Sequence, residues 1–135
     1  MEDCIFCKIV NGDVLSSKIY EDDAFLAFLD IAPVHPGHIL VIPKEHYPLL
    51  TNVPEEILQK YLIVVQKVSR ALVDGLELNG FNLGMNNGSV AGQIVPHVHF
   101  HVMPRTEGDG LKLWSQRSYA EGEADEVAGK IKDAL

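Results

Sequence analysis

Three histidines at alternating positions carry the strongest chemical signal in this sequence. Segment 96–103 contains His97, His99 and His101, each followed by an apolar residue. Side chains alternate between the two faces of a strand, so the three imidazoles would share one face. A helix would spread them over more than half of its circumference. Titratable rings side by side repel one another when charged, so such a row is typical of a chemical site rather than a solvated surface.

Two kinds of chemistry fit this row. Histidines at positions i and i+2 of a strand lie about 6.6 Å apart at Cα, close enough to share a zinc ion. Alternatively, one neutral imidazole acts as a nucleophile and the others orient and assist it. The polar loop 88–93 directly precedes the row and is expected to bring backbone N–H groups beside it, which favours an oxyanion or a phosphate over a bare cation. The loop lacks the Lys-Ser/Thr ending of a P-loop, which excludes Walker-type binding.

Cys4 and Cys7 form a Cys-x-x-Cys pair, which is a weak signal by itself. A redox pair of the thioredoxin type follows a strand, and only three residues precede Cys4. Two interpretations stay open on the residues alone. The pair forms two buried free thiols, or it supplies half of a tetrahedral zinc site that needs two further ligands.

The sequence resembles the histidine triad (HIT) family of nucleotide hydrolases and transferases, whose signature is His-x-His-x-His followed by apolar residues. The resemblance covers nearly the whole chain. Segment 104–110 resembles the corresponding segment of the prokaryotic, zinc-containing, HINT-like members. Leu29 and Ile94 depart from the animal phosphoramidase branch. The matching segments, in order, are 4–9, 28–31, 37–46, Asn86 with Gly92-Gln93, and the signature itself at 97–103.

The resemblance implies a role for each matching position. His99 would be the nucleophile that attacks the α-phosphorus of a nucleotide conjugate and becomes transiently nucleotidylated. His101 would donate to the phosphate oxygens, assisted by Asn86 and the turn formed by Gly92 and Gln93. Asp30 would accept from the ribose hydroxyls. The purine pocket would be built by five apolar residues: Ile5, Phe6, Ile9, Phe28 and Leu40.

Simpler interpretations of the same residues stay open. Asp30 also fits the start of the turn before Pro33, and Asn86 fits an ordinary amide at a strand end. The five apolar residues fit a plain hydrophobic core equally well.

The resemblance also implies a metal site, because prokaryotic members with this Cys-x-x-Cys use two histidines as further ligands. A closed Cys₂His₂ site is structural, since it leaves no position open for substrate. No Asp/Glu cluster for magnesium accompanies the triad, so we expect catalysis without magnesium. The implied zinc ligands are Cys4, Cys7, His46 and His97.

We therefore expect an enzyme that releases a nucleoside 5′-monophosphate from an amine or phosphate leaving group, with phosphoramidates as the expected conjugates, through a nucleotidyl-histidine intermediate. A purine nucleotide such as AMP, or its conjugates, is the expected ligand. A dinucleoside polyphosphate hydrolase is the nearest alternative. A zinc-containing nucleotide-binding module with little turnover is an alternative of another class.

The family resemblance also implies a homodimer, in which the long helix and strand 81–85 pair across a two-fold axis. An exposed edge strand such as 81–85 would otherwise invite aggregation, which agrees with this arrangement.

The elements that position these residues follow from periodicity and from the glycines and prolines. We expect a single domain, 1–135, of α+β class with a HIT-like fold: an antiparallel sheet of about five strands, a long helix and short terminal helices. Asn52 is expected to cap the long helix and Gly75 to end it. His35 and His38 are expected to be loop or strand-edge residues. Strands are expected at 18–21, 25–29, 38–42, 81–85 and 97–103, and helices at 4–11, 54–72 and 121–135.

Composition limits the partners. The 135 residues are 47% hydrophobic and 22% charged, which is typical of a globular chain. The formal net charge of -8 argues against nucleic acid and anionic membranes, both of which require a basic surface. We find no secretion signal and no apolar run of about 20 residues, so we expect a cytoplasmic protein.

Overall fold

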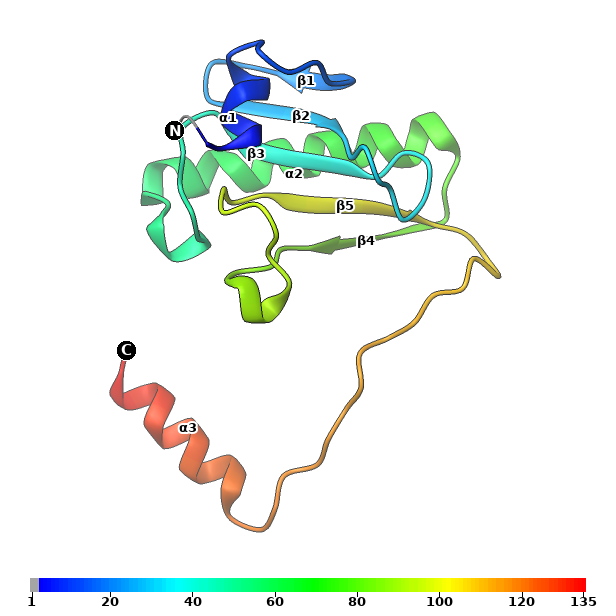
Figure 1. The fold of residues 1–135 in the computed structure, drawn as a ribbon. Helices are drawn as coiled ribbons and strands as arrows, with labels where there is room; N and C mark the ends of the chain where they lie inside the picture. Colours follow the sequence, from blue (N-terminus) through cyan, green and yellow to red (C-terminus); the bar gives the residue numbers. More distant parts are fainter. Residues whose placement is uncertain (1–2) are drawn as a thin grey trace.

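A five-stranded antiparallel sheet is the centre of the computed structural model, which describes residues 3–135 (Figure 1). Its strand order is β1-β2-β3-β5-β4, so β1 and β4 are the edges and β3 and β5 are neighbours at the centre. The strands are β1 (Lys18–Glu21), β2 (Phe25–Leu29), β3 (Ile39–Pro43), β4 (Gly80–Gly84) and β5 (Phe100–Arg105). The helices are α1 (Ile5–Val10), α2 (Glu55–Leu76) and α3 (Glu123–Asp133), with two 3₁₀ turns, η1 (Leu50–Asn52) and η2 (Ser89–Ala91).

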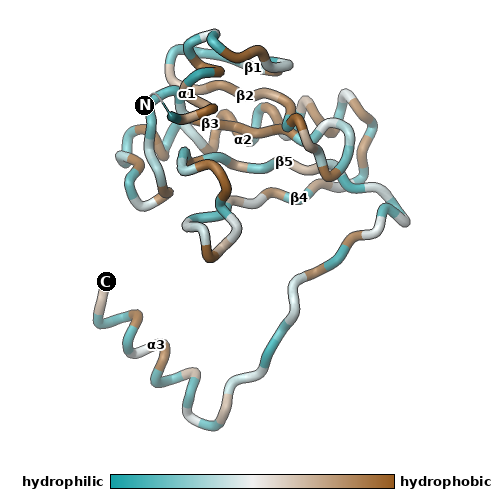
Figure 2. Tube along the Cα trace, viewed as in Figure 1, coloured by the Kyte–Doolittle hydropathy of each residue, from teal (hydrophilic) through white to brown (hydrophobic). Residues whose placement is uncertain are grey.

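The two faces of the sheet are covered by different helices. Alternation along β2 and β3 sends Ala27 and Val41 to the α2 side, and Phe28 and Leu40 to the α1 side. Strands β2 and β3 are therefore hydrophobic on both faces. Figure 2 shows both strands as largely hydrophobic along their length. The expected α+β class and antiparallel sheet are confirmed.

The histidine row lies on the α1 face of the sheet. His101 pairs with Leu40 across the β3–β5 ladder, and directly paired residues share a face. Val98 and Val102 are buried on the opposite face with α2. The predicted alternation between imidazoles and apolar residues is confirmed.

The last strand begins at Phe100, so the predicted start at His97 is wrong. The neighbouring β3 ends at Pro43, which has no N–H to continue a ladder. The chain before Phe100 bonds to the loop after β3 instead: the Val98 N–H donates to the Tyr47 carbonyl over 2.7 Å.

The long helix differs from the prediction at both ends. Its N-cap is Pro54, while Asn52 accepts a hydrogen bond from the Leu49 N–H and so caps the turn η1. Gly75 lies inside the helix, which runs to Leu76 and ends at Glu77 in the left-handed region with φ 54°. Residues of α2 such as Val68 and Leu72 are buried against the sheet. This packing stabilises the helix, so it continues through a glycine, whose intrinsic helix propensity is low.

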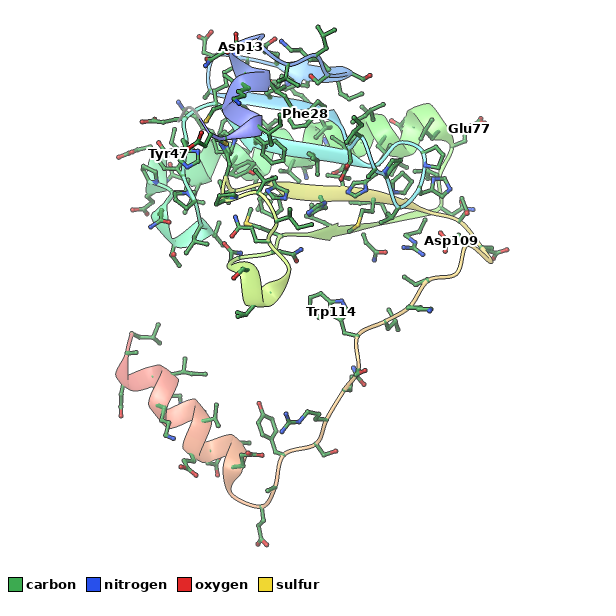
Figure 3. The ribbon with its side chains drawn as sticks, in the orientation of Figure 1. Asp13, Phe28, Tyr47, Glu77, Asp109 and Trp114 are labelled. Atoms are coloured by element: carbon green, nitrogen blue, oxygen red, sulfur yellow. The ribbon has the colours of Figure 1, made fainter. Side chains whose placement is uncertain are left out.

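Residues 106–135 leave the sheet as an extended arm that ends in α3 (Figure 1). Trp114 lies on this arm away from the sheet (Figure 3) and is 91% exposed. The polar terminal helix predicted at 121–135 is present over the shorter range of α3. In residues 3–135, no helix has the length and apolar character that crossing a membrane requires.

Tyr61 joins α2 to the centre of the sheet and gives a first prediction. Its buried hydroxyl donates to the Val41 carbonyl of β3, and burial raises the pKa of Tyr61, which keeps the donor protonated. Tyr61→Phe should lower the free energy of unfolding by about 1–2 kcal/mol, because a buried carbonyl loses its side-chain donor. Urea denaturation measures the change. Tyr119→Phe, at a tyrosine on the arm, is the matched control, and equal stabilities of the two variants would contradict the prediction.

Candidate functional site

The three histidines of the row converge at the end of the sheet beneath α1. His97 and His99 lie in the extended lead-in to β5, and His101 lies within the strand. His97 and His99 are 0% and 6% exposed, and His101 is half-buried. The ring centroids of His99 and His101 lie 4.8 Å apart. The row is therefore a packed group, with solvent access mainly at His101.

A backbone carbonyl fixes the tautomer of the His99 ring. Its Nδ1 lies 2.7 Å from the carbonyl oxygen of His97, and because a carbonyl only accepts, Nδ1 carries the hydrogen. Burial lowers the pKa of His99, which favours the neutral ring. The lone pair of a neutral ring protonated at Nδ1 lies on Nε2. His99 thus has the form that a nucleophile or a metal ligand needs.

His38 orients His101, a contact that the sequence analysis missed. The Val34 N–H donates to His38 Nδ1 over 3.2 Å, so the neutral His38 ring carries its hydrogen on Nε2. That Nε2 lies 2.9 Å from His101 Nδ1, which therefore accepts and leaves the hydrogen of His101 on Nε2. Burial is the main cause that lowers the pKa of His101 to about 4, so the ring is a neutral donor at pH 7.

The prediction for His38 was therefore incomplete: it sits at the strand edge, as expected, but is 3% exposed and in contact with the row. The available signal was its place directly before the buried strand β3, which pairs with β5. His35 lies in the loop, where its Nδ1 contacts the Pro36 carbonyl.

Asp30 serves the turn and also faces the histidines. One carboxylate oxygen accepts from the Ala32 N–H over 2.9 Å, which is the turn-starting role considered above. The other oxygen lies 3.7 Å from His38 Nε2. A single carboxylate therefore closes the loop after β2 and adds negative charge beside the row.

The loop before the row is held mainly by its own hydrogen bonds. The side chain of Gln93 accepts from the Gly88 N–H and donates to the Pro48 carbonyl. The N–H groups of Gly92 and Gln93 donate to carbonyls inside the loop, so in this conformation they do not point a donor at the histidines. Asn86 Nδ2 lies 3.4 Å from the Gly92 carbonyl, and Gly92 adopts φ 91°, where a side chain would be strained.

Four of the five residues predicted to line a purine pocket form a buried cluster between α1 and the sheet. Phe6 packs edge-on against Phe28, with ring centroids 5.5 Å apart, and against His99, with centroids 5.1 Å apart. Ile5 is 40% exposed on the outer side of α1. The structure thus shows a core that reaches the row; the predicted pocket residues within that core are Phe6, Ile9, Phe28 and Leu40.

A second group of sulfur and nitrogen atoms that could bind a metal surrounds the His97 end of the row. His97 Nδ1 is 3.4 Å from Cys4 Sγ, 3.6 Å from Cys7 Sγ and 3.2 Å from His46 Nδ1, and Cys7 Sγ is 3.5 Å from His46 Nδ1. Tetrahedral zinc with these ligands requires S···N separations of about 3.5 Å and an N···N separation of about 3.3 Å. The four predicted ligand atoms all lie within 4.8 Å of one another, and the four separations above match those that zinc needs.

The chemistry of this donor set also fits a cation. His97 Nε2 donates to the Pro43 carbonyl over 2.8 Å, which leaves the lone pair of the neutral ring on Nδ1, inside the cluster. Burial lowers the pKa of His97 to about 4 and also lowers that of His46, so both rings are neutral at pH 7, the state in which an imidazole can bind a metal. Burial and the neighbouring Cys4 raise the pKa of Cys7, so a Cys7 thiolate at this place requires a positive charge beside it.

Comparison with known proteins extends these observations. The model of the HIT domain matches residues 11–108. An uncharacterized HIT-like protein of Methanocaldococcus jannaschii is 50% identical over 131 residues, covering 96% of this chain and 98% of that protein. An adenosine 5′-monophosphoramidase of Schizosaccharomyces pombe is 43% identical over 135 residues, covering 96% of this chain and 98% of that protein.

Solved structures show the same fold. A HIT family protein of Bacillus subtilis superposes with a TM-score of 0.91 at 41% identity. The match covers 98% of this chain and 97% of the Bacillus subtilis chain. A zinc-bound histidine triad protein of Mycobacterium smegmatis superposes with a TM-score of 0.77 at 39% identity, with 99% of each chain covered.

The neutral state of His101 predicts a pH dependence of stability. The pKa of His101 lies at about 4 in the folded protein and near 6.5 when unfolded, so between these values the unfolded chain binds the extra proton. The free energy of unfolding should therefore fall as the pH is lowered from 7 to 4.5. Urea denaturation across this range should give a shallower fall for His101→Gln than for the parent. His35→Gln serves as the control and should keep the parent's slope; a His101→Gln slope equal to the parent's would refute the prediction.

Proposed function

The chain belongs to the HIT domain family, and from that premise we propose that it hydrolyses conjugates of nucleoside 5′-monophosphates. The observation that carries this proposal is the hydrogen bond from His99 Nδ1 to the His97 carbonyl, which leaves a lone pair on Nε2 of a neutral ring. The phosphoramidase activity in the name of the fission-yeast relative supports an amine as leaving group. A purine nucleotide such as AMP is the proposed product.

The proposed reaction has two displacements at the α-phosphorus. His99 Nε2 attacks the phosphorus, the phosphorus–nitrogen bond of the substrate breaks, and the leaving amine takes up a proton from solvent. Water then attacks the phosphorus of the nucleotidyl-histidine and loses a proton to solvent, which releases the nucleoside monophosphate and restores the neutral imidazole. Covalent catalysis of this kind divides one difficult displacement into two easier ones.

The neighbouring residues would stabilise the charge and hold the nucleotide. His101, with its hydrogen on Nε2, is the proposed donor to a phosphate oxygen, where negative charge develops. Asp30 is the proposed acceptor for the ribose hydroxyls. Asn86, Gly92 and Gln93 are proposed to shape the phosphate side. The apolar residues Ile5, Phe6, Ile9, Phe28 and Leu40 are proposed to form the base pocket.

His99→Ala tests this proposal. Turnover of adenosine 5′-monophosphoramidate should fall by several orders of magnitude, because the variant has no nucleophile. The affinity for AMP, measured by calorimetry, should change only modestly, since the proposed ribose and phosphate contacts remain.

Near-normal turnover in His99→Ala would overturn the proposal. The control is His35→Ala in the exposed loop, which should keep the parent's activity. A parent enzyme that cleaves only diadenosine polyphosphates would establish the polyphosphate alternative. A parent that binds AMP and cleaves neither substrate would establish a binding module.

We further propose that Cys4, Cys7, His46 and His97 bind one zinc ion, which would supply the bonds that hold α1 to the sheet. The matched ligand spacings and the zinc-bound mycobacterial relative support this proposal. Both cysteines are free thiols, which agrees with a reducing compartment, and we propose that the protein is cytoplasmic.

His46→Gln tests the zinc site. Purified parent protein should contain about one zinc per chain, whereas the variant should lose it and melt at a lower temperature, because ligand bonds contribute to folding. His35→Gln should retain both the zinc and the melting temperature. Elemental analysis and calorimetry measure these values, and a full zinc content in His46→Gln would exclude the proposed ligand set.

We also propose that residues 1–135 act as one domain that forms a homodimer through the edge strand β4 and helix α2. Phe81 and Leu83 are 39% and 44% exposed on this edge. They adjoin a groove whose apolar walls include Leu62 and Val73 of α2. A second copy related by a two-fold axis would cover the groove and satisfy the open strand edge.

Leu83→Glu tests the dimer, because a charge buried at the interface is costly. Sedimentation at micromolar concentration should show about twice the chain mass of 14.9 kDa for the parent and a monomer for the variant. Ile63→Glu is the control, since Ile63 lies on the flank of α2 that faces the β1–β2 hairpin. A parent that sediments strictly as a monomer would contradict the proposal.

A further inference from the structure

His97 belongs to two sites at once. Its Nδ1 lies among the sulfur and nitrogen atoms of the proposed zinc site, and its Nε2 donates to the Pro43 carbonyl. Its carbonyl oxygen accepts the hydrogen of His99 Nδ1. Both ring nitrogens and the main chain of one fully buried residue are therefore engaged.

The peptide group between His97 and Val98 connects these sites. Its oxygen holds His99, and its N–H donates to the carbonyl of Tyr47 over 2.7 Å. Tyr47 directly follows His46, another proposed ligand. The orientation of this single peptide group is thus set from one side by His97 and from the other by the residue next to His46.

Helix α1 supplies a second connection. Phe6 lies between Cys4 and Cys7 in the sequence, and its ring packs edge-on against both His97 and His99, with centroids 5.8 and 5.1 Å away. A helix of six residues is too short to be stable by itself. Bonds at the two flanking sulfurs would hold it, and they would therefore hold Phe6 against the His99 ring.

We propose that His97 is a positioning residue that couples the Cys4–Cys7–His46–His97 site to the His99 imidazole. Nucleotide transfer by His99 then depends on whether that site holds its zinc ion. When the four side chains are bound, the His97 carbonyl stays in place and His99 keeps its hydrogen on Nδ1. When they are released, the peptide group turns more freely and the imidazole samples both tautomers, of which only one presents the Nε2 lone pair. This coupling rests on the proposed role of His99 as nucleophile.

The tautomer of His99 gives a readout that does not require turnover. In ¹⁵N-labelled protein loaded with zinc, nuclear magnetic resonance should show one His99 tautomer, with its hydrogen on Nδ1. After zinc is removed by a chelator under reducing conditions, the folded protein should show a mixture, and added zinc should restore the single form. An unchanged His99 spectrum in folded, metal-free protein would overturn the coupling.

Two matched variants test the coupling in zinc-loaded protein, where unfolding on metal removal plays no part. His97→Cys and His46→Cys each leave a Cys₃His set, which is a regular zinc ligand set. Only His97→Cys removes the anchor to the Pro43 carbonyl. Its kcat should be lower than that of His46→Cys by about tenfold or more, with similar KM, because small displacements of a reacting group reduce catalysis steeply. Equal kcat values in the two zinc-loaded variants would overturn the coupling.

These measurements separate the coupling from the proposed function. If the His99 tautomer follows the zinc content while the parent hydrolyses no nucleotide conjugate, the structural coupling of the zinc site to the His99 imidazole stands and the proposed function fails. If the parent hydrolyses the conjugate, while the tautomer does not depend on zinc and kcat is equal in the two zinc-loaded variants, the function stands and the coupling fails. His35→Gln, at a loop histidine outside both sites, should behave as the parent in every measurement.

Discussion

One hydrogen bond decides what the central histidine can do. Because the His97 carbonyl accepts from His99 Nδ1, the lone pair of the neutral ring must lie on Nε2. Burial enforces the neutral form by lowering the pKa. A main-chain oxygen serves this purpose better than a carboxylate, since it fixes the tautomer without adding a charge that would favour the imidazolium.

The rest of the fold keeps that carbonyl in place. Alternation along the chain puts the imidazoles on the α1 face, while Val98 and Val102 anchor the same segment to α2. His38 fixes the tautomer of His101 through Nε2, as the His97 carbonyl does for His99. The proposed zinc site lies behind the row, so the side chains that would bind nucleotide and those that would bind metal share one short segment.

The sequence predicted this arrangement where periodicity or motif spacing determines it. The hairpin of β1 and β2 has the predicted bounds, and the row of histidines has the predicted face. The start of β5 could not be predicted, because it depends on Pro43 ending the neighbouring strand and on the Tyr47 carbonyl, both distant in sequence. The contact between His38 and His101 depends on the register of β3 and β5 in the same way. Similarly, nothing in residues 106–122 predicted an arm that leaves the sheet, since its apolar side chains also fit a packed segment.

The identity of the residue that carries the nucleotide tests the account most directly. Parent protein is quenched during turnover of adenosine 5′-monophosphoramidate, digested under mildly alkaline conditions and analysed by mass spectrometry. Catalysis by His99 predicts one adduct with the mass of a nucleoside monophosphate on that residue, labile in acid as a phosphoramidate bond is. An adduct on His97 or His101, or turnover without any adduct, would contradict it.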